Sequence, residues 1–154
     1  MGGLFLVRDD DGAAATLAGA RVQYGRHGLT AFHDIALPGW RGFHTPFIHG
    51  GPAGFLADGD DLAAVAGTLV VDDEMGAPAL RKLIAMMAAG TPDWSRIGGQ
   101  FVALVRSAGR TSLFTDFFGA FQLFHDAGWE VLSTSFLAAA ETVPTVSFDP
   151  QGVY

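Results

Sequence analysis

The sequence predicts an α+β fold in which helices cover antiparallel strands. Three observations lead to this prediction. One clear amphipathic helix lies near the middle of the chain, and four short strands separated by tight turns follow it in the last third. The chain has 154 residues, of which 49% are hydrophobic, and it contains no linker, internal repeat or low-complexity tract. Length and composition therefore suit one domain, residues 1–154, with a sizeable core.

The first third of the chain begins with an apolar run and then becomes irregular. Gly3–Val7 is expected to form a buried strand, and Ala13–Arg21 a short helix with Asp11 as its N-cap. The stretch Gly25–Gly59 is rich in proline and glycine, which favours turns over long elements. The two short strands expected within it are Leu29–Leu37 and Phe43–Ile48.

The middle of the chain predicts one strand and the clearest helix. Leu62–Val71 ends in β-branched and apolar residues, which is typical of a strand. Apolar side chains then recur with helical spacing, and Pro78 and Gly90 suit the first turn and the end of a helix. This helix is expected over Ala77–Ala89. Its apolar stripe consists of Leu80, Leu83, Ile84 and Met87.

The last third predicts four strands joined by short turns, which are expected to form an antiparallel meander. A short helix over Ser135–Glu141 is expected to follow, capped by Thr134 or Ser135. Aromatic residues concentrate in the meander, which indicates a sheet face packed on the core. The expected strands are Phe101–Arg106, Thr111–Thr115, Phe121–His125 and Trp129–Ser133. The aromatic residues are Phe101, Phe114, Phe117, Phe118, Phe121, Phe124 and Trp129.

The charge and the missing cysteines exclude several classes of function. The formal net charge is −7, and so acidic a chain repels nucleic-acid phosphates. Without cysteine the chain has no disulfide, no thiolate zinc site and no cysteine nucleophile. No apolar stretch reaches the roughly 18 residues of a membrane span, and the charged residues from Arg8 onward leave no room for a secretory signal. We therefore expect a cytoplasmic protein that binds neither nucleic acid nor membrane.

Polar clusters that resemble metal or acid–base sites have simpler interpretations. Four of the five histidines lie within His27–His49, but their spacing matches no zinc motif, and ordinary loop and strand histidines are expected. Asp58–Asp61 lacks the alternating ligands of a calcium loop and is expected to be a solvated turn. The carboxylates of Asp72–Glu74 are expected to act at the N-terminus of the helix that follows. We expect no metal site and no catalytic site among these residues.

Four segments of the last third, in order, resemble motifs of the glutaminase domain of asparagine synthetases. Ile97–Val105 is similar to the strand L-x-G-x-F-A-F of that family, and Thr115–Phe124 to its segment R-D-x-x-G-x-x-P-L-Y. Leu132–Ala139 resembles F-A-S-E-x-K-A-L, and Phe148–Tyr154 resembles the F-P-P-G-x-Y that closes the domain. The first hundred residues fit more loosely, with Gly25–Gly28 where the family often has H-R-G.

The resemblance implies the N-terminal-nucleophile fold, a four-layer sandwich of two antiparallel sheets between helices. It also implies descent from class II glutamine amidotransferases, in which a cysteine exposed by removal of the first methionine attacks glutamine, with its own α-amine as base. Here that position is Gly2. The oxyanion-hole motif N-G-E corresponds to Ala66, Gly67 and Thr68, of which only the glycine matches. The resemblance therefore implies a degenerate domain without catalytic residues.

The groups that bind glutamine in this family are missing as well. Its substrate-binding aspartate falls near Gly76 and its arginine near His44, where neither residue type occurs, and Arg41 is out of place. Lasso-peptide cyclases are related proteins whose glutaminase domain has likewise lost its catalytic residues. Their next domain uses ATP to form an amide. The resemblance implies that this chain is the N-terminal part of such an enzyme. ATP and magnesium would then belong only to a downstream synthetase domain, the expected partner.

Two other functions stay open on the sequence. One is a free-standing binding or self-associating module. The other is an active glutamine amidotransferase or amidohydrolase with an unrecognised nucleophile, Thr16 or Ser135. The apolar residues of Trp40–Phe55 either complete the core or form an exposed patch through which the domain pairs as a two-fold homodimer. They are Trp40, Phe43, Phe47, Ile48 and Phe55.

Overall fold

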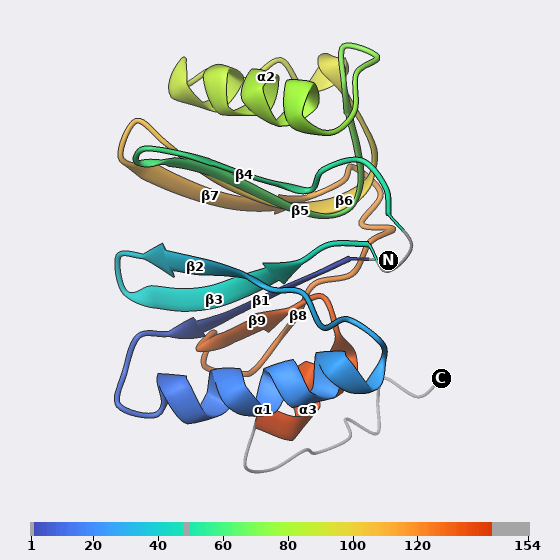
Figure 1. The fold of residues 1–154 in the computed structure, drawn as a ribbon. Coiled ribbons are helices and arrows are strands. Elements are labelled where there is room, and N and C mark those ends of the chain that lie inside the picture. Colours follow the sequence, from blue (N-terminus) through green and yellow to red (C-terminus); the bar gives the residue numbers. More distant parts are fainter. Residues whose placement is uncertain (1, 48–49, 143–154) are drawn as a thin grey trace, which may run out of the picture.

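Two antiparallel sheets lie face to face between helices in the computed structural model, which describes residues 2–47 and 50–142 (Figure 1). Sheet A has the strand order β2-β3-β1-β9-β8, and sheet B the order β4-β5-β6-β7. The helix α2 covers the outer face of sheet B, while α1 and α3 cover the outer face of sheet A (Figure 1). The fold is therefore α+β with two layered antiparallel sheets, as the sequence predicts.

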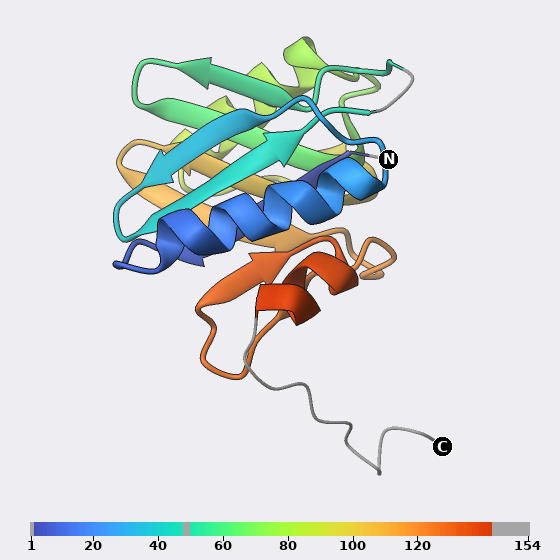
Figure 2. The same cartoon turned by 60° about the horizontal axis from the view of Figure 1, so that its bottom comes forward.

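The elements follow one another along the chain with short connections. The strands are β1 (Gly3–Arg8), β2 (His33–Leu37), β3 (Trp40–Thr45), β4 (Phe55–Asp58), β5 (Asp61–Val71), β6 (Ile97–Ser107), β7 (Arg110–Thr115), β8 (Phe124–His125) and β9 (Val131–Ser133). The helices are α1 (Ala13–Arg26), α2 (Ala77–Ala88) and α3 (Phe136–Thr142), and a 3₁₀ turn, Trp94–Arg96, precedes β6. Figure 2 shows α1 and α3 beside each other on sheet A. Among the helices that the structure describes, none is long and apolar enough to cross a membrane.

Three apolar clusters fill the spaces between the four layers. Leu80 and Leu83 of α2 pack on the outer face of sheet B. Successive residues of β1 point to opposite sides of sheet A, as a strand requires. Leu4 and Leu6 face sheet B and form the cluster between the sheets, whereas Phe5 and its neighbour Val7 pack under α1. The apolar first strand is thus buried on both faces, which explains its unbroken apolar sequence.

The predicted meander is wrong, because its four strands belong to different sheets. The hairpin of β6 and β7 lies in sheet B, and the hairpin of β8 and β9 lies in sheet A. Residues 116–123 cross from one sheet to the other and contain no strand, so the strand expected at Phe121–His125 is reduced to Phe124 and His125. Short strands with tight turns look alike in sequence whether or not they pair in one sheet, so this distinction needs tertiary contacts.

Several element boundaries also differ from the sequence prediction. The first helix continues to Arg26, five residues further than expected, and its N-cap is Gly12 instead of Asp11. The strands expected at Leu29–Leu37 and Phe43–Ile48 are β2 and β3, with shifted bounds, and β4 was missed. The expected strand at Leu62–Val71 and the helix over Ala77–Ala89 are confirmed to within one residue. Ser135 caps α3, because its Oγ accepts a hydrogen bond from Ala138 N at 3.3 Å.

Trp40, Phe43 and Phe55 belong to the core, and the exposed patch expected as the alternative is wrong for these three residues. Phe43 is fully buried against Phe5 at a ring distance of 5.5 Å. Trp40 and Phe55 are half-buried and pack against the cluster between the sheets. Phe47 is half-buried, and Ile48 lies outside the described residues.

Candidate functional site

A pocket of about 390 Å³ opens at the N-terminal end of β1, where a nucleophile would stand in the fold implied by the motif resemblance. β1 is the central strand of sheet A and pairs with β3 on one side and β9 on the other. The wall combines hydroxyl groups and an imidazole with apolar side chains. The lining residues are Gly2, Tyr24, His27, Leu29, Phe121, Thr134, Ser135, Phe136 and Leu137.

The backbone leaves no space for a side chain at the first two described positions. A Cβ on Gly2 would lie 2.5 Å from the carbonyl oxygen of Thr45, far inside van der Waals contact. A Cβ on Gly3 would lie 2.3 Å from Cε1 of Tyr24. A nucleophilic residue at position 2 is therefore not only missing from the sequence but also incompatible with the packing around it.

A cluster of hydroxyl groups lies beneath this end of β1. The hydroxyl of Tyr24 donates to the carbonyl oxygen of Leu4 at 3.0 Å and lies 3.2 Å from Ser133 Oγ. Thr134 Oγ1 accepts from the backbone N–H of Leu4 at 2.9 Å, and Thr134 N donates back to the Leu4 carbonyl at 2.9 Å. Ser133 Oγ donates to the carbonyl oxygen of Ser135 at 2.9 Å. These bonds tie β1 to β9 and α1.

The hydroxyl cluster is not arranged for nucleophilic catalysis, which requires a base within hydrogen-bond reach of the nucleophile. In the described parts of the chain, the Tyr24 and Ser133 hydroxyls donate to backbone carbonyls and not to an imidazole or carboxylate. Burial raises the pKa of Tyr24, so its phenol stays protonated near neutral pH. Ser135 Oγ is engaged as the cap of α3, and Thr16 lies half-buried on α1.

The residues that correspond to the oxyanion motif lie on β5, near the same region. Gly67 has a positive φ of 97°, and a Cβ there would lie 2.2 Å from the carbonyl oxygen of Gln100 and 2.8 Å from Cδ2 of Phe121. Ala66 is buried between the sheets, and Thr68 is exposed. Phe121 therefore covers Gly67 and also lines the pocket beside Gly2. Of the four motif positions, Gly2 lines this pocket and Gly67 lies against Phe121, which forms part of the pocket wall.

The histidines do not converge on one point in the described residues. His44 is buried, and its Nε2 donates to the carbonyl oxygen of Val65 at 3.0 Å. His33 stacks on His44 and on Phe55, at ring distances of 5.8 and 4.6 Å. His27 is exposed at the pocket, and His49 lies outside the described residues. Within residues 2–47 and 50–142, no three His, Asp or Glu side chains are grouped so that they could hold a metal ion.

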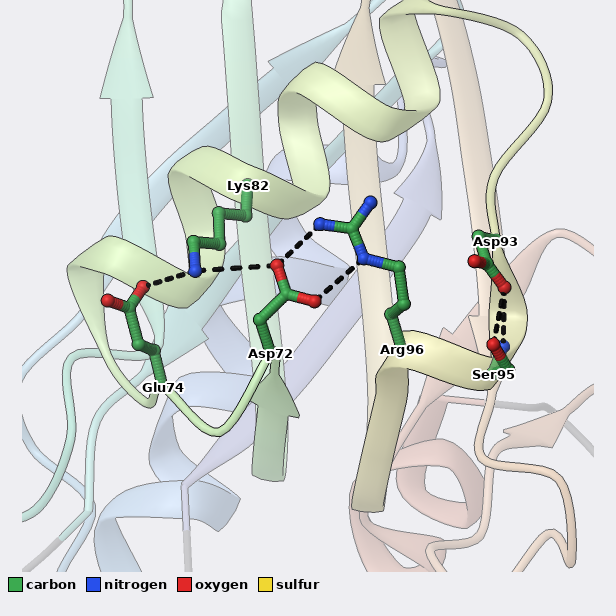
Figure 3. A network of polar contacts seen from close by, with 6 residues as sticks. All are labelled: Asp72, Glu74, Lys82, Asp93, Ser95 and Arg96. Carbon is green, nitrogen blue, oxygen red and sulfur yellow. Dashed lines mark hydrogen bonds and ion pairs between the residues drawn. The ribbon is translucent and has the colours of Figure 1, made fainter.

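Asp72 and Glu74 form an ion-pair network with Lys82 of α2 and with Arg96 of the 3₁₀ turn before β6, as Figure 3 shows, whereas Asp73 is exposed. Arg96 donates to both carboxylate oxygens of Asp72, at 2.7 and 2.5 Å, and Lys82 bridges Asp72 and Glu74. The hydrogen bonds from Arg96 lower the pKa of Asp72 to about 2. A carboxyl group with so low a pKa stays ionised near neutral pH and does not serve as a general acid there. No side chain caps α2 at its N-cap Gly76, so the capping part of the expected role is wrong, although Asp72 and Glu74 both pair with Lys82 of α2.

Asp58–Asp61, which the sequence analysis compared with a calcium loop, is the turn that joins β4 to β5, as the sequence predicts. Arg41, which lies near the position of the family's arginine, pairs with Asp9 at 2.6 Å. It is therefore engaged on the outer part of sheet A and does not reach the pocket at Gly2.

A second hollow, which the sequence did not predict, lies between the first half of β6 and the end of β7. It has a volume of about 470 Å³ and is bordered by Trp94 and Phe114, whose rings meet edge to face at 5.2 Å. Phe117 and Phe118 also border it and are 96% and 88% exposed. The interpretation of the aromatic residues as a packed sheet face is therefore correct for Phe101, which is buried, and wrong for these two. Trp129, 55% exposed, is a third exception.

Comparison with known proteins does not assign this chain to a family. It matches no protein-family model, no curated protein and no solved structure. The motif order in the last third of the chain and the geometry at Gly2 are therefore the observations that bear on its function.

Proposed function

We propose that this chain is a non-catalytic, glutaminase-like domain of the N-terminal-nucleophile type, belonging to an asparagine-synthetase-related enzyme that forms amides with ATP. The closed packing around Gly2 carries the proposal. The residue before the central strand of one sheet is where such a fold keeps its nucleophile, and here a Cβ would collide with the Thr45 carbonyl. Two antiparallel sheets between helical layers support the fold assignment.

Hydrolysis of a glutamine amide would require three groups that this chain does not bring together. A nucleophile must attack the carbonyl carbon, a base must take the proton of that nucleophile, and N–H groups must stabilise the oxyanion. Position 2 offers no side chain, and Phe121 covers Gly67, where the oxyanion motif falls. The domain then contributes structure or substrate docking, and ATP and magnesium are bound by a synthetase domain that forms the partner.

A glutaminase assay tests the catalytic part of the proposal. The purified chain is expected to release no ammonia from glutamine above the buffer background. Ser135→Ala and Thr16→Ala serve as controls, since activity that either substitution abolished would reveal an unrecognised nucleophile and refute the proposal. The second part is tested by the reading frame that encodes residues after Tyr154, where the proposal expects an S-G-G-x-D-S motif.

A free-standing binding module is the second candidate function, and the hollow beside β6 favours it. Exposed aromatic side chains bordering a concave apolar surface are typical of sites that bind another molecule. The two functions are compatible, because a domain that has lost its catalytic groups can still dock a substrate or partner.

A further inference from the structure

The first half of β6 has an open edge. β6 pairs with β5 along its length, from Ile97 opposite Val71 to Arg106 opposite Leu62. Its pairing with β7 begins only at Val102, which lies opposite Thr115. Residues 97–100 therefore have a strand on one side and, in the described part of the chain, none on the other. Strand edges of this kind expose backbone N–H and C=O groups that can pair with another extended chain.

The open edge runs along the aromatic hollow. The hollow is lined by residues 97–99 of β6, by Trp94 and by residues 114–118. Gly98 and Gly99 add no side chains, and a Cβ on Gly98 would meet no atom within 4 Å. The backbone edge of β6 is therefore accessible from a hollow that accepts a large apolar side chain.

The protein holds Phe117 and Phe118 in this exposed position through Asp116. The Asp116 carboxylate, itself buried, accepts four backbone N–H hydrogen bonds between 3.0 and 3.2 Å. Their donors are Phe101, Phe118, Ala120 and Phe121. The two phenyl rings also contact each other edge to face at 5.1 Å. Because the loop is fixed by these bonds, a partner would bind without the entropic cost of ordering it.

We propose that the hollow and the open edge of β6 form a docking site for an extended, basic peptide segment of another polypeptide. The segment adds a short strand beside residues 97–100 and inserts an aromatic or large aliphatic side chain between Trp94 and the pair Phe117 and Phe118. Addition of a strand supplies backbone hydrogen bonds, and the hollow supplies side-chain selectivity.

The charge of the chain selects this occupant over two others. With a net charge of −7, the protein is repelled by an anionic membrane surface and by a second copy of itself, while a basic peptide is attracted. The described residues that line the hollow include one carboxylate, Asp116, and no lysine or arginine. This lining therefore carries no cation that would repel a basic partner.

Selection from a displayed library of random dodecapeptides tests the proposal on the full chain. The expected peptides carry an aromatic or large aliphatic residue flanked by β-branched residues and have a net positive charge. A synthetic copy of an enriched peptide is then titrated by calorimetry into the wild type and the double variant Phe117→Ser, Phe118→Ser. Loss of both rings is expected to weaken binding by about thirtyfold or more, as for other central aromatic contacts. Val22→Ser removes an apolar side chain that is also exposed, 58% on α1, but lies outside the hollow, and is expected to leave binding unchanged.

A backbone-methylated peptide separates strand addition from simple apolar contact. Methylation of alternate amide nitrogens removes the donors that would pair with β6 and is expected to weaken binding by about tenfold or more. The proposal is overturned if no peptide is enriched, if the double variant binds as the wild type does, or if methylation has no effect. It is also overturned if sedimentation shows a wild-type dimer that the double variant loses, because a second copy would then occupy the site.

Discussion

Acidification is expected to weaken the fold through His44, the buried imidazole between the two sheets. Burial lowers the pKa of His44 from 6.5 to about 4, although the hydrogen bond to Val65 acts in the opposite direction and the charge of His33 adds a smaller lowering effect. The folded protein thus keeps His44 neutral while the unfolded chain takes up a proton. Stability from this group is fully present above pH 6.5 and is lost as the pH falls toward 4. The difference between the two pKa values corresponds to about 3 kcal/mol.

Urea unfolding at a series of pH values between 7 and 4 measures this effect, with His44→Phe as the non-titrating variant. The phenyl ring retains the stacking on Phe55, and loss of the donor to the Val65 carbonyl is expected to cost about 1–2 kcal/mol at pH 7. The variant should nevertheless show a flatter dependence of the unfolding free energy on pH. His27→Gln, which removes an exposed histidine, is the matched control and should keep the wild-type slope.

Two results would refute this reasoning. One is a wild-type protein that loses no more stability than His44→Phe between pH 7 and pH 4.5. The other is an NMR titration in which the His44 ring protonates near pH 6.5. Carboxylates whose pKa is lowered in the fold, such as Asp116 through its hydrogen bond from Phe121, also lose their stabilising contribution as the pH falls below about 5. Because the wild type and His44→Phe share these carboxylates, the difference between the two proteins isolates the effect of His44.

Three further substitutions, with Gly98→Ala as a control for the first, test other features of the structure. Gly2→Cys is expected to lower the free energy of unfolding by about 1–3 kcal/mol through its clash with the Thr45 carbonyl, without creating glutaminase activity, whereas Gly98→Ala should be tolerated. Activity in Gly2→Cys would contradict the closed packing. Asp116→Ala removes the acceptor of four backbone N–H groups and should lower the thermal midpoint by several degrees in circular dichroism; an unchanged midpoint would argue against a fixed loop. Asp73→Gly relieves a positive φ of 63° at an exposed turn and should stabilise the protein by roughly 0.5 kcal/mol in urea unfolding, so a lower midpoint would count against strain there.

The sequence alone predicted the elements whose patterns are local. The apolar run of β1 predicts a strand buried on both faces, and the apolar stripe of α2 predicts a helix buried on one face. Both patterns lie within one short stretch of sequence. The last five residues of α1 were missed, since Gly25 and the exposed Val22 break the apolar period there. The split of the last four strands between two sheets depends on contacts far apart in the chain, which no local pattern encodes.

For the candidate sites, motif order located positions but not their surroundings. Gly2 and Gly67 were singled out from the motifs, yet the collisions that a Cβ would meet there arise from Thr45, Gln100 and Phe121. The exposure of Phe117 was not predictable, because phenylalanine in a strand-rich segment is ordinarily buried. The signal that could have indicated it is the adjacent Asp116, an acidic residue followed by two aromatics and a glycine, which is typical of a side-chain-bonded turn.

The position of β1 also sets the order in which the protein can assemble during synthesis. β1 is completed first, but one of its neighbours, β9, lies near the end of the described chain, and Leu4 bonds to Thr134 across 130 residues. Sheet B, by contrast, is formed from the contiguous segment 55–115, so it can close while the ribosome is still adding residues. Until Val131 emerges, one edge of β1, which is apolar from Gly3 to Val7, stays without its partner and is free to pair with another nascent chain. We therefore expect the yield of folded protein to depend on how quickly the last third of the chain is translated, or on a chaperone that shields β1 during that interval.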